Sequence, residues 1–205
     1  WFQARVGVIT ASRFADAVSV LKKASGTKKA GDPSGAAEKY AYDLAIERVS
    51  QKHYGDTFET FAMKRGTELE AMARMLYESR TSNFVDEAGI VLTDDRLFGY
   101  STDGFVNSDG LIEIKCPIDS VKVFNILKTG DVSEYMHQMQ GGMWITGRKW
   151  CDFVMHCPDL AAVGKDLYIK RIERDEEFIS KLETDLMAFA AVVSDCETLL
   201  KQKAA

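Results

Sequence analysis

The chain has 205 residues, of which 46% are hydrophobic and 28% charged, as expected for a globular protein with one core. A net charge of −5 and a pI near 5.3 argue against a passive, uniformly basic nucleic-acid binder, but not against an enzyme whose active site carries acids. No apolar run approaches the roughly 20 residues that cross a bilayer, and no signal-peptide pattern is present. The four cysteines form no CxxC pair and the three histidines are scattered, which argues against a zinc site and leads us to expect a reducing cytoplasm. Because the sequence begins at Trp1, we expect a short N-terminal piece to precede it.

Hydrophobic periodicity and capping residues predict the elements in chain order. A short apolar segment over residues 6–9 comes first, and Thr10 or Ser12 can cap a short helix through about Leu21. After a lysine-rich loop, we predict helices over 36–53 and 58–79, strands over 89–92, 98–106 and 111–116, helices over 121–127 and 133–145, strands over 150–156 and 167–172, and a closing helix over 175–201. This order indicates an α/β fold in which helices flank a central mixed sheet.

The segment STDGFVNSDGLIEIKCP carries the strongest chemical signal. Side chains alternate along a strand, so Glu113 and Lys115 share one face while Ile114 points to the other. An odd-length turn at 107–109 would place Asp103 directly opposite Glu113 on that face. Two adjacent carboxylates are unfavourable without a cation between them, and a hard divalent ion beside a lysine is the chemistry of phosphodiester hydrolysis. The alternative is a structural salt bridge between Glu113 and Lys115.

Glu70 is a third candidate acid. On its predicted helix it lies at helical spacing from Met63, Gly66, Ala73 and Tyr77, within a stripe of apolar or small residues. A carboxylate there is either buried for a purpose or placed at the margin of the stripe. A nearby metal site would favour the first interpretation.

Other candidates lie on the predicted helices and in the loop near the N-terminus. Gln138 or Gln140 could orient a water or a phosphate oxygen, but glutamines on such a helix usually face solvent. Arg5 and Ser12 could hold a phosphate, and the alternatives are a surface ion pair and a plain cap. The loop lysines could contact DNA or form a solvated loop; they are Lys22, Lys23, Lys28 and Lys29.

Several ordered motifs together resemble the lambda exonuclease and YqaJ-type viral recombinase family. The matching segments are Trp1 with Arg5 to Ser12, Gly66 to Glu70, Ser101 to Gly104, Glu113 to Pro117, Tyr135 to Gln140 leading to Met143-Trp144, and Ile172 to Glu176. They cover nearly the whole chain. The resemblance implies a restriction-endonuclease-like core in one PD-(D/E)XK exonuclease domain over residues 1–205.

The resemblance also implies an activity, a cofactor and partners. The expected enzyme is a Mg²⁺-dependent exonuclease, with Mn²⁺ as a substitute, that digests one strand of linear duplex DNA from the 5′ end to mononucleotides. It leaves a 3′ overhang for phage-type recombination in a host cytoplasm. A ring-shaped homotrimer and a single-strand annealing protein are the expected partners.

The resemblance assigns roles to individual residues. Asp103, Glu113 and the Ile114 carbonyl would bind the metal, with Glu70 completing the region. Lys115 would activate or position the attacking water, assisted by Gln138. Arg5, Ser12 and Ser101 would hold the 5′-phosphate, and Met63 would split the terminal base pair or serve as a core methionine.

The sequence departs from the family at two positions. Thr102 stands where the family has a proline before the first acid, which the chemistry tolerates because it needs only the carboxylate. A phosphate-pocket arginine has no clean match, and Lys22 or Lys23 would be its substitute without reproducing its bidentate contact. The rival functions are a structure- or sequence-specific endonuclease on the same core and a catalytically inactive DNA-binding module.

Overall fold

The computed structural model describes residues 2–55 and 60–202, except for the side chains of Phe2 and Met63. Two compact units divide the chain. The first contains Trp1–Asp56, Ile90–Tyr100 and Asp175–Ala205, and the second contains Thr57–Gly89 and Ser101–Arg174. No helix within the described ranges is long and apolar enough to span a membrane. One exonuclease domain over residues 1–205 stays a prediction.

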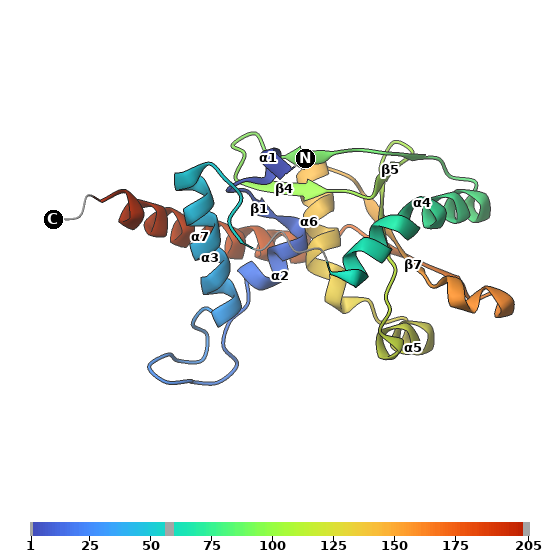
Figure 1. The fold of residues 1–205 in the computed structure, drawn as a ribbon, viewed down its shortest axis with the longest axis horizontal. Helices are drawn as coiled ribbons and strands as arrows, with labels where there is room; N and C mark the ends of the chain where they lie inside the picture. The colour runs from blue at the N-terminus through green and yellow to red at the C-terminus, as the bar shows by residue number, and fades with distance from the viewer. Residues whose placement is uncertain (1, 56–59, 203–205) are drawn as a thin grey trace. The chain divides into compact units, whose positions relative to one another are not determined.

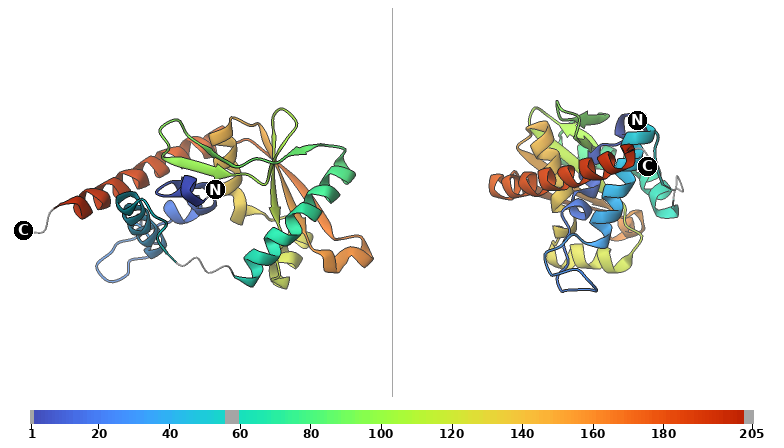
Figure 2. Two further views of the ribbon diagram at one scale, coloured as in Figure 1. Left: turned by 45° about the horizontal axis from the view of Figure 1, so that its top comes forward. Right: turned by 90° about the vertical axis from the view of Figure 1, so that its left-hand side faces the viewer.

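The first unit contains a small sheet in the order β1-β4-β3. β1 (Ile9–Thr10) runs parallel to β4 (Phe98–Ser101), and β3 (Ile90–Leu92) completes it. The helices are α1 (Phe2–Arg5), a 3₁₀ turn at Ala11–Arg13, α2 (Phe14–Ala17), α3 (Gly35–Ser50) and α7 (Glu176–Lys201). α3 crosses α7 and packs against it (Figure 2), and the Tyr40 ring stacks on Phe189 with ring centroids 5.5 Å apart.

The second unit is built on a five-stranded mixed sheet in the order β2-β5-β6-β7-β8, of which β5 and β7 are labelled in Figure 1. The strands are β2 (Val85–Asp86), β5 (Gly104–Val106), β6 (Gly110–Lys115), β7 (Trp150–His156) and β8 (Leu167–Glu173). β6 and β7 run parallel, while the β2–β5, β5–β6 and β7–β8 pairs are antiparallel. The prediction of a mixed sheet flanked by helices is confirmed.

Helices of the second unit pack on this sheet. They are α4 (Phe61–Thr81), α5 (Ser120–Thr129), α6 (Met136–Thr146) and 3₁₀ turns at Ser133–Tyr135 and Pro158–Val163. α4 buries Ala73 and Tyr77 against Ile112 and Val154. Glu113 instead bonds to Gln138 of α6. Because strand side chains alternate between faces, α4 and α6 contact opposite faces of β6.

Several predicted boundaries differ from the observed ones. The apolar segment 6–9 contributes only Ile9 to a strand, and the helix predicted through Leu21 ends at Ala17. The strand predicted over 98–106 is two strands, β4 and β5, separated at Thr102 and Asp103. The short strand β2 and the 3₁₀ turn at Pro158–Val163 were not predicted, whereas the bounds of β7 match.

Candidate active site

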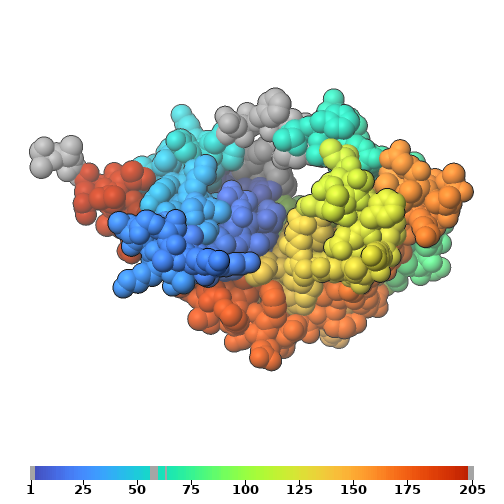
Figure 3. Space-filling model, turned by 90° about the horizontal axis from the view of Figure 1, so that it is seen from below, coloured from blue at the N-terminus to red at the C-terminus, as the bar shows by residue number. Residues whose placement is uncertain are grey.

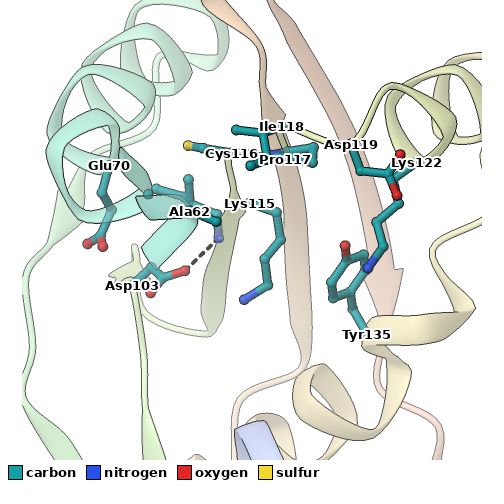
Figure 4. Close-up of a pocket in the computed structure, with 12 residues that line it drawn as sticks. Ala62, Glu70, Asp103, Lys115, Cys116, Pro117, Ile118, Asp119, Lys122 and Tyr135 are labelled. Atoms are coloured by element: carbon teal, nitrogen blue, oxygen red, sulfur yellow. Dashed lines mark hydrogen bonds between the residues drawn. The ribbon is translucent and has the colours of Figure 1, made fainter. Parts of the chain in front are cut away.

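The β5–β6 hairpin brings two acids together. Its register pairs Gly104 with Ile112 and Val106 with Gly110 across a turn at residues 107–109. One step further along the same register, Asp103 lies opposite Glu113. Oδ2 of Asp103 accepts a hydrogen bond of 2.6 Å from the Ile114 N–H (Figure 4). The predicted juxtaposition of Asp103 and Glu113 is therefore confirmed as geometry.

Contacts from outside the hairpin fix its turn. The Arg148 guanidinium donates to the carbonyl oxygens of Asn107 at 2.8 Å and Gly110 at 3.3 Å. The same guanidinium lies over the Phe105 ring, 4.4 Å from its centroid. A Cβ at Gly110 would overlap the ring of Trp150, so only glycine fits at the first residue of β6. These contacts fix the register that sets Asp103 opposite Glu113.

The Glu113 side chain is fully buried, with an exposed fraction of 0%. Its Oε1 accepts a hydrogen bond of 2.6 Å from Nε2 of Gln138 and forms a short ion pair with Nζ of Lys115. The Lys115 ammonium also lies 5.7 Å from the centroid of the Tyr135 ring, which stacks on Phe153. Glu113 and Lys115 thus share one face, as the strand alternation predicted.

The electrostatics of the pair favour an added positive charge. Burial raises the pKa of Asp103 well above its ordinary value, and the negative charge of Glu113 raises it further. Lys115 and the Ile114 N–H oppose this rise only in part. Burial alone would lower the pKa of Lys115, but Glu113 and Asp103 outweigh burial and raise it. The buried Glu113 carboxylate and the half-buried Asp103 carboxylate beside one ammonium leave an unbalanced negative charge that a cation would neutralise.

A cavity of about 480 Å³ opens beside these groups. Asp103, Ile114 and Lys115 line it from the hairpin, Glu70 and Gly66 line it from α4, and Tyr135 lines it from the 3₁₀ turn before α6. Figure 4 shows Glu70 and Asp103 on the same side of this space. Oε1 of Glu70 accepts a hydrogen bond of 2.7 Å from Arg74, and the Glu70 side chain is 34% exposed. Glu70 therefore lies at the margin of the apolar stripe, facing the cavity.

The oxygen atoms at this site suit a hard cation that needs few ligands from the protein. Within residues 2–55 and 60–202, no group of three or more His, Cys, Asp or Glu side chains is arranged to hold a metal. Asp103, Glu113 and the Ile114 carbonyl supply two carboxylates and one backbone oxygen. Mg²⁺ prefers oxygen ligands and keeps several of its waters, so two carboxylates are a sufficient protein contribution. The raised pKa of Asp103 supports the same fit, because a bound cation would relieve it.

The N-terminal phosphate candidates belong to the first unit. Arg5 donates to Oγ1 of Thr10 at 3.4 Å, and that oxygen lies 3.5 Å from Oγ of Ser12. Ser12 is exposed, Arg5 is half-buried and Thr10 is buried, so the Ser12 hydroxyl and part of the Arg5 side chain are accessible here. Thr10 forms no side-chain cap on the following 3₁₀ turn, and the N-cap residue of α2 is Arg13, so neither Thr10 nor Ser12 caps a helix as predicted.

The other candidates for DNA contact lie in separate parts of the chain. Ser101 is the half-buried last residue of β4 and falls in the second unit. Lys22 and Lys23 are exposed in the loop between α2 and α3 (Figure 3, blue). Met63 lies in α4, but its side chain is outside the described part of the chain, as is all of Trp1.

Comparison with known proteins decides the family. The model of the YqaJ-like viral recombinase domain matches residues 1–149. The chain belongs to the YqaJ-like viral recombinase family. An alkaline exonuclease from Laribacter hongkongensis, LHK-Exo, is 36% identical with a TM-score of 0.82, and the match covers 98% of this chain and 95% of that one. LHK-Exo in complex with dAMP is 37% identical with a TM-score of 0.84 over the same shares.

A more distant structure supports the fold. A phage-related exonuclease from Haemophilus somnus 129PT is 18% identical with a TM-score of 0.72, covering 95% of this chain and 96% of that one. A search of curated proteins found no match. This YqaJ-like chain thus has the mixed α/β architecture of these exonucleases. The viral recombinase family and the exonuclease neighbours together support a phage-type exonuclease.

Residues that sequence reasoning did not single out also form the site. Tyr135 supports Lys115, and Arg74 holds Glu70 from one helical turn away. A basic residue four positions after an acid on a helix was an available signal for Arg74. Gln140, the alternative to Gln138, is fully buried and donates to the Glu173 carbonyl at 2.9 Å, so it is structural.

Proposed function

We propose that this chain is a Mg²⁺-dependent 5′-to-3′ exonuclease that digests one strand of linear duplex DNA to mononucleotides. The product would carry the 3′ overhang that phage-type recombination uses, in a host cytoplasm. The observation that carries the proposal is the pairing of Asp103 with Glu113 in one hairpin, beside Lys115 and an open cavity. The exonuclease relatives support it, and a nucleoside monophosphate bound by one of them agrees with release of mononucleotides.

The residues of the site would divide the work. Asp103, Glu113 and the Ile114 carbonyl would hold Mg²⁺, and Glu70 would act through water at the cavity margin. A bound Mg²⁺ supplies a Lewis acid that lowers the pKa of water and stabilises the leaving oxygen. Lys115, on the cavity wall, would hold the attacking water in line with the scissile bond. Gln138 would fix the Glu113 carboxylate through its 2.6 Å hydrogen bond, and Mn²⁺ would substitute because it also accepts oxygen ligands.

Substrate and partners form the second part of the proposal. Arg5, Ser12 and Ser101 would hold the 5′-phosphate, because a guanidinium fork and hydroxyls suit phosphate oxygens. Lys22 and Lys23 would add phosphate contacts from the exposed loop, and Met63 would separate the terminal base pair. A homotrimer around the duplex and an annealing protein on the exposed 3′ strand are the proposed partners. Light scattering on the purified protein would test the trimer, and a monomeric mass would contradict it.

The decisive experiment compares two DNA forms. Wild-type protein is incubated with a linear duplex and with a covalently closed circle of the same sequence, with Mg²⁺ or with EDTA. We expect mononucleotides from the linear form only, and none with EDTA. Asp103→Asn should lower the rate about a thousandfold or more, since a lost metal ligand removes several kcal/mol of transition-state stabilisation.

The matched control is Asp109→Asn in the hairpin turn. Asp109 does not line the cavity, and its carboxylate forms a 3.2 Å ion pair with Lys149. It should cleave within about threefold of wild type, because exposed ion pairs contribute little. Cutting of the closed circle would favour the endonuclease alternative. DNA binding without cleavage in Mg²⁺ or Mn²⁺ would favour the inactive binding module and overturn the proposal.

A further inference from the structure

The hydroxyl group of Thr102 closes a ring around the backbone of Asp103. Thr102 is buried, with an exposed fraction of 6%. Its Oγ1 donates to the Gly104 carbonyl at 2.9 Å and accepts from the Gly104 N–H at 3.1 Å. Both partner atoms belong to the residue immediately after Asp103. One hydroxyl therefore ties together the two ends of the short segment that carries the acid.

The anchor of this ring is itself fixed. Gly104 begins β5 and is the first residue paired with β6, through Ile112. A Cβ at Gly104 would overlap a methyl group of Val85 and approach a methyl group of Ile112 to 3.3 Å. Packed this closely between two strands, Gly104 cannot shift without moving its neighbours. The Thr102 hydroxyl thus links Asp103 to a rigid point of the sheet.

Asp103 needs such a link because it lies outside β5. The β5–β6 ladder starts at Gly104, so the strand pairing does not fix the backbone of Asp103. Its carboxylate is held by the Ile114 N–H at 2.6 Å. A residue between two strands keeps freedom in φ and ψ that one hydrogen bond of its own side chain does not remove. The Thr102 hydroxyl, bonded to both the N–H and the carbonyl of Gly104, restricts the backbone angles of Asp103 between them.

We propose that Thr102 is a positioning residue, whose hydroxyl sets the backbone of Asp103 so that its carboxylate stays opposite Glu113 to receive a divalent cation. This inference rests on the proposed function for the role of Asp103. The competing explanation is that the hydroxyl only satisfies buried backbone groups and contributes to stability alone. The two explanations predict different metal affinities in variants of equal stability.

Three variants of the full-length chain separate them. Thr102→Val keeps the shape and removes the hydroxyl, whereas Thr102→Ser keeps the hydroxyl and removes a methyl group. The matched control is Thr81→Val at the end of α4. The Thr81 hydroxyl also makes two local backbone bonds, donating to Tyr77 O at 2.8 Å and accepting from Asn83 N at 3.3 Å. It does not line the cavity beside Asp103.

The readouts are Mn²⁺ binding by titration calorimetry without DNA, urea unfolding, and kcat and KM on linear duplex. We expect Thr102→Val, which loses both hydrogen bonds of the hydroxyl, to weaken Mn²⁺ binding about tenfold, a change of about 1.4 kcal/mol. Its kcat should fall with little change in KM for DNA. Thr102→Ser should stay within about threefold of wild type. Thr81→Val should lose comparable stability and bind Mn²⁺ as wild type does.

Each outcome is decisive. Thr102→Val binding Mn²⁺ like wild type overturns the positioning role while leaving the proposed function intact. Equal weakening by Thr81→Val, or failure of Thr102→Ser to restore affinity, also overturns it. If Thr102→Val does not fold, Thr102→Ala compared with Thr102→Ser carries the same test. A wild-type chain that neither binds Mn²⁺ nor cleaves DNA overturns the proposed function and this inference together.

Discussion

Gln138 and Glu113 are joined by a hydrogen bond of 2.6 Å, from Nε2 of the amide to Oε1 of the carboxylate. The bond connects α6 to β6 across 25 positions of sequence. The same oxygen is paired with Lys115. Gln138 therefore contacts an acid of the site directly, so it can orient Glu113 before any substrate arrives.

Gln138→Ala should lower kcat and Mn²⁺ affinity about 10- to 100-fold, the usual loss when a partner of a metal ligand is removed. Steady-state kinetics and metal titration measure both. The control is Gln140→Ala on the same helix, which removes a structural bond to the Glu173 carbonyl. It should lower stability while the rate per folded molecule stays near wild type. A Gln138→Ala enzyme with unchanged metal affinity would contradict the role.

Lys115→Ala should lower kcat by ~10²–10⁴, the range for groups that handle the proton or water of the reaction. Single-turnover cleavage of a linear duplex measures the chemical step. Lys122→Ala is the matched control, because Lys122 lines the same cavity but pairs with Glu134. That variant should lose less than about threefold. A loss of tenfold or less in Lys115→Ala would make Lys115 a structural partner of Glu113.

Arg5→Ala should slow digestion of 5′-phosphorylated ends about tenfold or more, since hydrogen bonds to charged groups are worth about 1.5–3 kcal/mol. Digestion of 5′-hydroxyl ends should change much less. Competition between the two kinds of end in one tube measures the preference. Lys39→Ala removes an exposed charge paired with Asp43 in the same unit, and it should leave the preference unchanged. Equal losses on both ends would count against phosphate recognition.

Tyr77→Phe should destabilise the second unit by about 1.5–3 kcal/mol, because Tyr77 donates to a buried charged acceptor. Its hydroxyl bonds Oδ2 of Asp152 at 2.6 Å, and Arg171 holds the same carboxylate through two bonds of 2.9 Å. Urea unfolding should show a lower midpoint with an unchanged slope. Tyr42→Phe, at an exposed position, should unfold like wild type. Equal midpoints for the two variants would refute the prediction.

The sequence predicted the hairpin geometry because that geometry is local. Strand alternation fixes which side chains share a face, and an odd turn between 106 and 110 fixes which residues oppose each other. The same local reasoning correctly placed the bounds of β7. Local geometry was therefore enough to predict that three residues lie close together: Asp103, Glu113 and Lys115. Their roles in catalysis stay predictions.

Other features depend on interactions that the pattern does not encode. The strand predicted over 98–106 is interrupted because the Thr102 hydroxyl bonds to the backbone of Gly104 in place of a regular ladder. Thr10 does not cap a helix because its hydroxyl contacts Arg5 and Ser12 instead. The choice between Gln138 and Gln140 needed the packing of α6 on the sheet, which is a tertiary property.

The Arg148 contacts make the turn at residues 107–109 unusually sensitive to inserted residues. Surface turns normally accept added residues. Here one inserted residue would shift the pairing of β6 by one position and turn the Glu113 side chain to the α4 face of the sheet. The insertion would also disrupt the hydrogen bonds from Arg148 to the carbonyls of Asn107 and Gly110. In an insertion scan of the whole gene, this short polar bend should therefore stand out as a site of lost activity, despite lying at the surface.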